Sequence, residues 1–162
     1  MKYCALLLLA LSMDVCLASD WRSSINAKLD ALSLQLNDGC SVEVKDARKL
    51  YDFKNPEQEL FASLISLEGQ HCGNGSIEYL VIYRLGYERP ATKEAKQVET
   101  YSLIALQIVG GRGERSVDFD SLKLNGNVFT LTARAYRNDP MCCPSLPVVL
   151  KYKLSFYGLR KL

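Results

Sequence analysis

The chain has 162 residues, of which 48% are hydrophobic and 23% are charged. Its 20 Lys and Arg against 18 Asp and Glu give a net charge of +2, so the overall balance provides no electrostatic footprint for nucleic acid. A chain of this length suits one ordinary domain that buries a substantial hydrophobic core.

The first 18 residues have the pattern of a secretory signal peptide. Met1 and Lys2 precede an apolar run over residues 3–11, and the tripeptide Cys16-Leu17-Ala18 ends in a small residue suited to cleavage. The run is too short to cross a bilayer, and no apolar stretch of spanning length follows it. We therefore expect a single mature domain over residues 19–162, periplasmic or secreted, without a transmembrane segment.

An amphipathic helix is expected at the start of the mature chain. Ser19 or Asp20 suits the N-cap, and Asn37-Asp38-Gly39 suits the end of the helix. Apolar residues recur at spacings of three or four at Trp21, Ile25, Leu29, Leu32 and Leu36. Such a helix must pack its apolar face on another element.

The next segment is ambiguous. A short strand is expected over residues 41–44. Asn55-Pro56-Glu57 has the form of a helix start, whereas residues 60–67 fit a strand or a helix equally well.

After Gly75 the strand signal dominates. Residues 77–85 and 101–109 are almost continuously apolar and suit central strands, and the charged segment 89–97 suits a solvated loop. Residues 117–124 and 128–136 flank Asn125-Gly126, a strong hairpin signal. The last strand has one dry and one wet face, because Val148, Leu150, Tyr152, Leu154 and Phe156 alternate with polar residues.

A simple antiparallel meander would place alternate turns at the same end of the sheet. The turns at residues 69–75, 110–115 and 138–147 would then share one end. Arg112 and Arg115, in the second of these turns, are suited to receive an anion or to enter an acidic cleft of a partner. The tyrosines suit the core and the sheet faces, and some suit an interface; they are Tyr79, Tyr83, Tyr101, Tyr136, Tyr152 and Tyr157.

The sequence offers little support for catalysis. A Ser or Cys nucleophile needs a base within reach, and His71 is the only histidine. There is no Cys-x-x-Cys motif, and His71, Cys72, Cys142 and Cys143 match no zinc-binding spacing. We therefore expect a protein that is not an enzyme and holds neither a cofactor nor a metal.

The segments "YLVIYRL", "YSLIALQIVGGRGERSVDFDSLKLNGNVFTLTARAY" and "NDPMCCPS" occur in an order that resembles a group of uncharacterised bacterial exported proteins and lipoproteins. The resemblance covers about residues 60–154, and its signature is Asp-Pro-Met-Cys-Cys-Pro-Ser/Thr, here residues 139–145. The layout of that group implies a strand over residues 60–67. Its members often carry an Asp-rich turn that resembles a calcium loop, but "EGQHCGNGSIEY" contains no Asp, so no calcium site is expected here.

Four cysteines, Cys40, Cys72, Cys142 and Cys143, follow the signal peptide, and an even number in an oxidising compartment indicates disulfides. Adjacent Cα atoms lie about 3.8 Å apart, closer than is usual in a disulfide, which favours crossed pairs between the two halves. The resembling group carries its two adjacent cysteines as one unit, which implies instead a Cys142–Cys143 bond and a Cys40–Cys72 bond. The sequence leaves both pairings open.

These patterns predict an α+β fold, with an N-terminal amphipathic helix packed on a mostly antiparallel, twisted sheet of about six strands and clamped by disulfides. The expected function is that of a non-enzymatic binding protein that presents rigid loops to a protein partner, as an inhibitor or an immunity protein does. The expected contact residues are His71, Arg112, Arg115, Asp139 and Met141. The alternative is a carrier that holds a small molecule or an envelope ligand between helix and sheet.

Overall fold

The computed structural model describes residues 20–55, 58–88, 97–139 and 143–162. The expected signal peptide, residues 1–18, and most of the charged segment 89–97 lie outside these residues. Within the described part, one α-helix accompanies a single sheet of ten strands, and no helix is long and apolar enough to cross a membrane.

The helix α1 (Trp21–Leu36) is the first described element. The Asp20 carboxylate accepts a hydrogen bond from the Arg22 N–H at 3.1 Å and so caps the first turn. Ile25, Leu29 and Leu32 are buried against the sheet, as their spacing predicts. The two faces of the helix are not cleanly separated, however, because Leu34 is 75% exposed.

The sheet is antiparallel throughout and follows the chain as a meander. Its strands are β1 (Val42–Glu43), β2 (Lys49–Asn55), β3 (Gln58–Gln70), β4 (Gly75–Glu88), β5 (Val98–Gly111), β6 (Arg115–Val117), β7 (Lys123–Asn125), β8 (Val128–Ala135), β9 (Leu146–Ser155) and β10 (Gly158–Lys161). The order is β1-β3-β4-β5-β6-β8-β9-β10, with β2 also beside β3 and β7 beside β8.

The prediction of about six strands was wrong, because the structure has ten. A short 3₁₀ helix, η1 (Lys45–Ala47), interrupts the chain that pairs with β3 and divides it into β1 and β2. The predicted strand 117–124 is likewise divided into β6 and β7, because Ser121 N–H bonds the Asp118 carbonyl at 3.1 Å and forms a turn. Tertiary pairing sets these breaks, and local composition does not reveal them.

Two further boundaries differ from the prediction. β2 ends at Asn55 and β3 begins at Gln58, so Asn55 belongs to a strand where a helix start was expected, and Pro56 and Glu57 lie outside the described residues. β9 ends at Ser155 and the chain turns into β10, which the sequence did not indicate. Phe156 was expected on the dry face of the last strand, but it lies in this turn and is 96% exposed.

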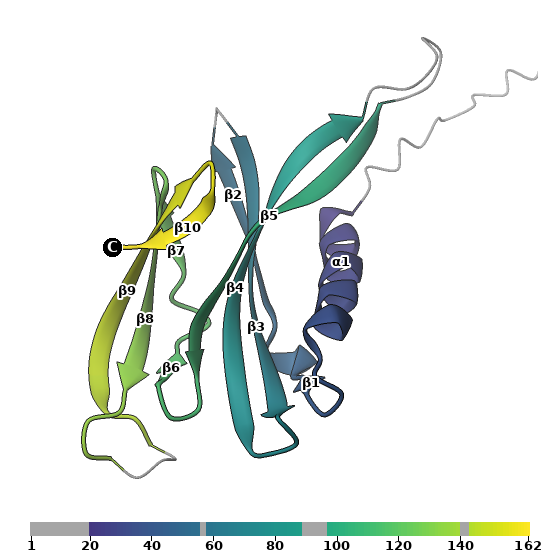
Figure 1. The fold of residues 1–162 in the computed structure, drawn as a ribbon. Helices are drawn as coiled ribbons and strands as arrows, with labels where there is room; N and C mark the ends of the chain where they lie inside the picture. The colour runs from purple at the N-terminus through teal and green to yellow at the C-terminus, as the bar shows by residue number, and fades with distance from the viewer. Residues whose placement is uncertain (1–19, 56–57, 89–96, 140–142) are drawn as a thin grey trace, which may run out of the picture.

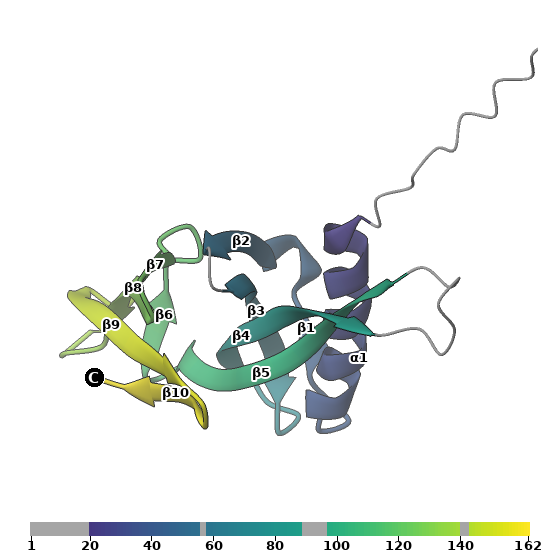
Figure 2. The ribbon, with the colours of Figure 1, turned by 90° about the horizontal axis from the view of Figure 1, so that it is seen from above.

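The sheet curls around an inner core (Figures 1 and 2). The inner faces of β3 and β4 contribute Leu64 and Leu80, and those of β8 and β9 contribute Phe129 and Leu150. On the opposite face of β3 and β4, α1 packs over a second core that includes Ile65 and Val81. The same two strands therefore carry both cores of the domain.

Side chains hold β2 against the segment that leads from β6 to β7. The Tyr51 hydroxyl donates to the Phe119 carbonyl, and Lys49 Nζ lies 2.9 Å from an oxygen of Asp120. The rings of Phe53 and Phe129 meet edge to face with centroids 5.8 Å apart. These contacts join the first and second halves of the curled sheet.

Candidate functional site

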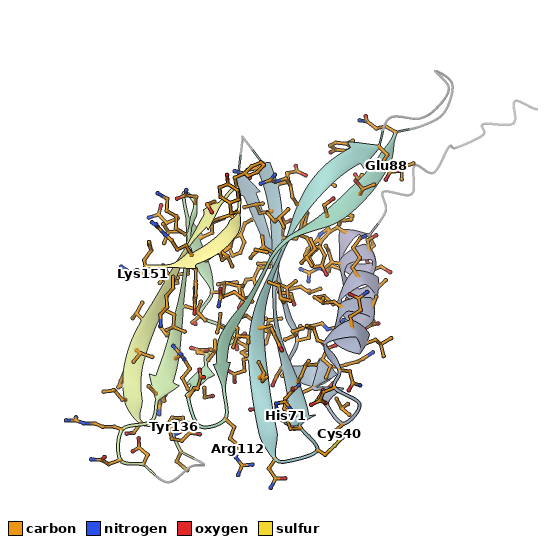
Figure 3. The ribbon with its side chains drawn as sticks, viewed as in Figure 1. Cys40, His71, Glu88, Arg112, Tyr136 and Lys151 are labelled. Atoms are coloured by element: carbon orange, nitrogen blue, oxygen red, sulfur yellow. A yellow bond between two sulfur atoms is a disulfide. The ribbon has the colours of Figure 1, made fainter. Side chains whose placement is uncertain are left out.

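Three turns meet at one end of the molecule, as a meander predicts. They connect β3 to β4, β5 to β6 and β8 to β9, and Figure 3 labels His71, Arg112 and Tyr136 at this end, with Glu88 at the other. The three turns border a polar cleft of about 560 Å³. Its lining includes Glu68, Glu78, Arg112, Arg115, Tyr136 and Pro144.

The cleft is the polar mouth of the inner core. Alternate residues of a strand share a face, so Glu78 follows the same inner row as Leu80, and Arg115 follows the same inner row as Val117. Leu80 and Val117 are buried in the inner core, whereas Glu78 and Arg115 line the cleft. The change from apolar to polar residues along each strand therefore marks where the core ends and the cleft begins.

Glu78 is the most strongly perturbed group of the cleft. Burial raises the pKa of its carboxyl to about 6, although the Val117 N–H and the charge of Arg115 act in the opposite direction. Its Oε2 accepts a hydrogen bond from the Val117 N–H at 2.9 Å. Gly110 makes room for this carboxylate, because a Cβ there would collide with it and would lie 2.9 Å from a methyl carbon of Val117.

Arg112 fixes the relative position of two of the turns. Its backbone N–H donates to the carbonyl and to the hydroxyl of Ser76, each at 3.1 Å. One nitrogen of its guanidinium donates to the Asn74 carbonyl at 2.6 Å. The turn from β5 to β6 is therefore tied to the turn from β3 to β4.

Arg115 lines the cleft and carries one unpaired donor. Its Nη2 donates to the Glu114 carboxylate at 3.2 Å, and its side chain is 24% exposed. Its Nε is buried and has no hydrogen-bond partner within the described residues. Buried donors are nearly always paired in folded proteins, so an unpaired nitrogen in the wall of the cleft is unusual.

His71 does not line the cleft, and its side chain is 89% exposed. Its backbone N–H donates to Asp38 Oδ2 at 2.6 Å, and its Nδ1 lies 3.7 Å from the same oxygen. The N–H groups of His71, Cys40 and Ser41 hold the pKa of the Asp38 carboxyl well below its usual range. Asp38 thus joins the loop after α1 to the turn from β3 to β4.

The same two segments are bonded covalently. Cys40 and Cys72 form a disulfide with their Cα atoms 4.9 Å apart. This bond excludes the crossed pairing of the four cysteines. Cys142 lies outside the described residues, and Cys143 is exposed in the connection between β8 and β9.

The Asp139 carboxylate organises its own loop. It accepts hydrogen bonds from the Ser145 hydroxyl at 2.7 Å, the Ser145 N–H at 3.2 Å and the Arg137 N–H at 3.1 Å. The bonds from Ser145 and Arg137 lower the pKa of Asp139. Met141, the other contact residue expected from this loop, lies outside the described residues.

Sequence reasoning identified Arg112 and Arg115 but missed Glu78 as a site residue. A signal was present, because Glu78 is the one acidic residue in the apolar stretch 77–83 and stands two positions before Leu80. Tyr136 was assigned with other tyrosines to the core, the sheet faces or an interface, and it lines the cleft. Its position depends on the curl of the sheet, which local sequence does not specify.

The cleft offers charged donors and acceptors of hydrogen bonds. Among the described residues, no group of three or more His, Cys, Asp or Glu side chains is placed to hold a metal ion. Two arginines and a carboxyl with a raised pKa can instead bind an oxyanion by charge and hydrogen bonds. No family model matches the chain, and no significant similarity was found to a curated protein or to a solved structure.

Proposed function

We propose that the protein is an exported, non-enzymatic binding protein that seats an acidic side chain of a protein partner in the polar cleft. An inhibitor or an immunity protein acts in this way, by covering a surface of its target. The observation that carries the proposal is the buried Nε of Arg115, which has no partner in the described part of the chain and lines a cleft with Arg112. A partner carboxylate that binds the exposed part of the Arg115 guanidinium and shifts the side chain enough to uncover Nε would complete the hydrogen bonding of this nitrogen.

The bonds that hold the turns around the cleft in place support a role in binding. The Cys40–Cys72 bond, the Asp38 carboxylate and the contacts of Arg112 each join two separate segments of the chain near the cleft. The bonds of Asp139 stiffen the third turn. Loops that are already ordered lose less conformational entropy when a partner binds.

The charge state of Glu78 should modulate this binding. An ionised Glu78 repels an incoming carboxylate, whereas the protonated form can donate a hydrogen bond to it. Because burial raises the pKa of Glu78 to about 6, the protonated form is well populated only at or below this pH. A partner carboxylate should therefore bind more tightly at pH 5.5 than at pH 7.5.

The test begins with capture of binding proteins from bacterial envelope extracts on immobilised wild-type protein and on the variant Arg115→Gln. The captured protein is then purified, and its Kd is measured for both forms. We expect Arg115→Gln to weaken binding about 30-fold or more, because a desolvated charge partner is lost. Lys28→Gln, an exposed change on α1, is the matched control. Equal binding by wild type and Arg115→Gln would exclude the cleft as the contact site.

Export is a separate part of the proposal and has its own test. The signal peptide pattern predicts a mature chain that starts at about Ser19, and the Cys40–Cys72 bond suits an oxidising compartment. After expression in a bacterial host, mass spectrometry of the periplasmic fraction should find this shortened, oxidised chain. A full-length, reduced chain in the cytosol would contradict export.

A second candidate function is a carrier of a small anionic molecule. The volume of the cleft, about 560 Å³, lies within the range of small-ligand sites and favours this candidate. The layer between α1 and the sheet is packed with buried side chains such as Leu29 and Ile65, so we place the ligand in the cleft instead. Titration with citrate or glutarate, followed by the NMR signals of the Arg112 and Arg115 guanidinium groups, would distinguish a small ligand from a protein partner.

A further inference from the structure

The net positive charge of the chain comes from its last quarter. Residues 123–162 contain seven Lys and Arg and a single Asp, whereas residues 1–122 contain thirteen basic and seventeen acidic residues. The small net charge of +2 therefore conceals two oppositely charged parts. Such asymmetry is typical of proteins that bind an anionic surface.

The sheet register gathers four of these cations on one face. Thr130 of β8 pairs with Lys123 on one side and with Lys151 on the other, and Lys153 of β9 pairs with Arg160 of β10. Directly paired residues share a face, and here it is the outer face, because the intervening residues of β9 belong to the inner core. We call Lys123, Lys151, Lys153 and Arg160 the basic face.

The cations of the basic face are available to a ligand. All four are exposed, and Figure 3 shows Lys151 on the outer side of β9. No acidic side chain in the described residues forms an ion pair with any of them. No ion pair within the described part of the chain therefore neutralises their charge.

Two aromatic residues stand at the tip of the hairpin formed by β9 and β10, which also carries Lys151, Lys153 and Arg160 of the basic face. Phe156 and Tyr157 form the turn between β9 and β10 and are 96% and 95% exposed, with their rings edge to face at 5.3 Å. The turn is fixed by the pairing of Ser155 with Gly158 and by a hydrogen bond of 3.0 Å from the Ser155 hydroxyl to the Gly158 carbonyl. The domain thus presents two adjacent aromatic side chains to solvent on an ordered tip.

We propose that the basic face and the Phe156-Tyr157 tip together bind the surface of a membrane that is rich in anionic lipid. Aromatic side chains favour the headgroup region, where their apolar part is buried and the tyrosine hydroxyl stays hydrated. At about 3.3 Å per residue along β9, Lys153 lies about 10 Å and Lys151 about 17 Å from Phe156. Both lysines can therefore contact lipid phosphates when the tip enters the headgroups.

The arrangement suits a membrane better than single-stranded nucleic acid. Proteins that bind single strands stack successive bases on aromatic side chains that lie along a positively charged groove. Here the two aromatic residues stand at the tip of the β9–β10 hairpin, and Lys151, Lys153 and Arg160 lie on the outer face of its strands, with Lys123 on β7. A lipid surface can be contacted by both at once.

The test is co-sedimentation of the purified exported protein with vesicles of phosphatidylcholine, with and without phosphatidylglycerol. We expect binding only to the vesicles that contain phosphatidylglycerol, and we expect added NaCl to weaken it. Lys151→Gln and Lys153→Gln should each reduce affinity about fivefold. The double variant Phe156→Ser/Tyr157→Ser should reduce it about tenfold or more, because the apolar contact is lost.

The controls are Lys28→Gln and Tyr87→Ser, which remove an exposed cation and an exposed aromatic residue elsewhere. Both should retain wild-type vesicle binding. Arg115→Gln should retain it too, and this result would show that the basic face and the Phe156-Tyr157 tip act independently of the cleft. Equal binding to pure phosphatidylcholine, or no loss in the tip and lysine variants, would overturn the proposal. Binding to single-stranded DNA without binding to anionic vesicles would also overturn it and would assign the basic face to a different polyanion.

Discussion

Two acidic side chains that are removed from water are held by different means. Glu43 is only 3% exposed, and both of its oxygens accept hydrogen bonds of 2.6 Å from the Arg48 guanidinium. Arg48 also bonds Asp30 of α1 at 2.7 Å, and this bond lowers the pKa of Asp30. Glu78 has a single backbone donor, the Val117 N–H, and burial therefore raises its pKa. The first arrangement anchors the helix, whereas the second leaves a carboxyl that can change charge near pH 6.

The pKa of Glu78 predicts a specific dependence of stability on pH. Its value is about 6 in the folded protein against 4.5 for an ordinary glutamate, so the folded state holds an extra proton between these values and stability falls as pH rises through them. Glu78→Gln removes this loss and should stabilise the protein by about 1 kcal/mol at pH 7.5, with no gain below pH 4.5, after allowance for partial solvent exposure.

Urea unfolding of both proteins from pH 4 to pH 8 measures this difference. Glu59→Gln, on the exposed part of β3, is the control and should follow the wild-type curve. Parallel curves for wild type and Glu78→Gln would show that Glu78 does not titrate in this window.

The network around Arg48 predicts a large loss of stability when Arg48 is replaced. A second substitution, at Glu43, should recover part of this loss. Arg48→Met leaves Glu43 buried without its charged partner and should lower the free energy of unfolding by about 3 to 5 kcal/mol. The double variant Glu43→Gln/Arg48→Met should be more stable than Arg48→Met alone, because no charge is then buried unpaired. Denaturant unfolding measures both, and equal stability of the single and double variants would contradict this account.

At the scale of elements, the Cys40–Cys72 bond links the end of α1 to the turn between β3 and β4 across 32 residues of chain. Removing it with Cys40→Ser/Cys72→Ser should cost about 3 to 4 kcal/mol, because the unfolded chain regains freedom. Urea unfolding of the oxidised wild type and of the double variant measures this cost.

Reductant provides the control for the disulfide. It should destabilise the wild type to the level of the double variant, and equal stability of oxidised and reduced wild type would contradict the prediction. A further effect of reductant on the double variant would reveal a second disulfide, and non-reducing peptide mapping would show whether it joins Cys142 to Cys143.

At the scale of the whole molecule, the two cores share β3 and β4. Neither core can be lost without disrupting strands on which the other depends, so we predict a single cooperative unfolding transition. Trp21 is the only tryptophan and packs on Phe61 at 4.8 Å between ring centroids, so its fluorescence reports the helix side. Circular dichroism at the sheet wavelength reports the strands, and the two curves should coincide. Separate midpoints would show that α1 unfolds independently.

The sequence by itself determined the local features of this protein. Spacing of apolar residues located α1 and the long strands β4, β5 and β9, since each pattern depends only on residues near in the chain. For residues 60–67, now part of β3, spacing left a strand and a helix equally open, and only the resemblance implied a strand. A simple meander then predicted that three turns share one end of the sheet. Arg112 and Arg115 lie in one of these turns and were therefore expected as site residues. For Cys40 and Cys72 the sequence allowed either a direct bond or crossed pairs.

The tertiary structure alone decided how these elements face one another. The curl of the sheet opposes the inner rows of β3 and β4 to those of β8 and β9, and it leaves a polar mouth beyond their core. The raised pKa of Glu78 follows from the side chains that exclude water around it, and the exposure of Phe156 follows from the turn into β10. Periodicity shows which face of a strand is apolar, but the partner that covers that face comes from distant parts of the chain.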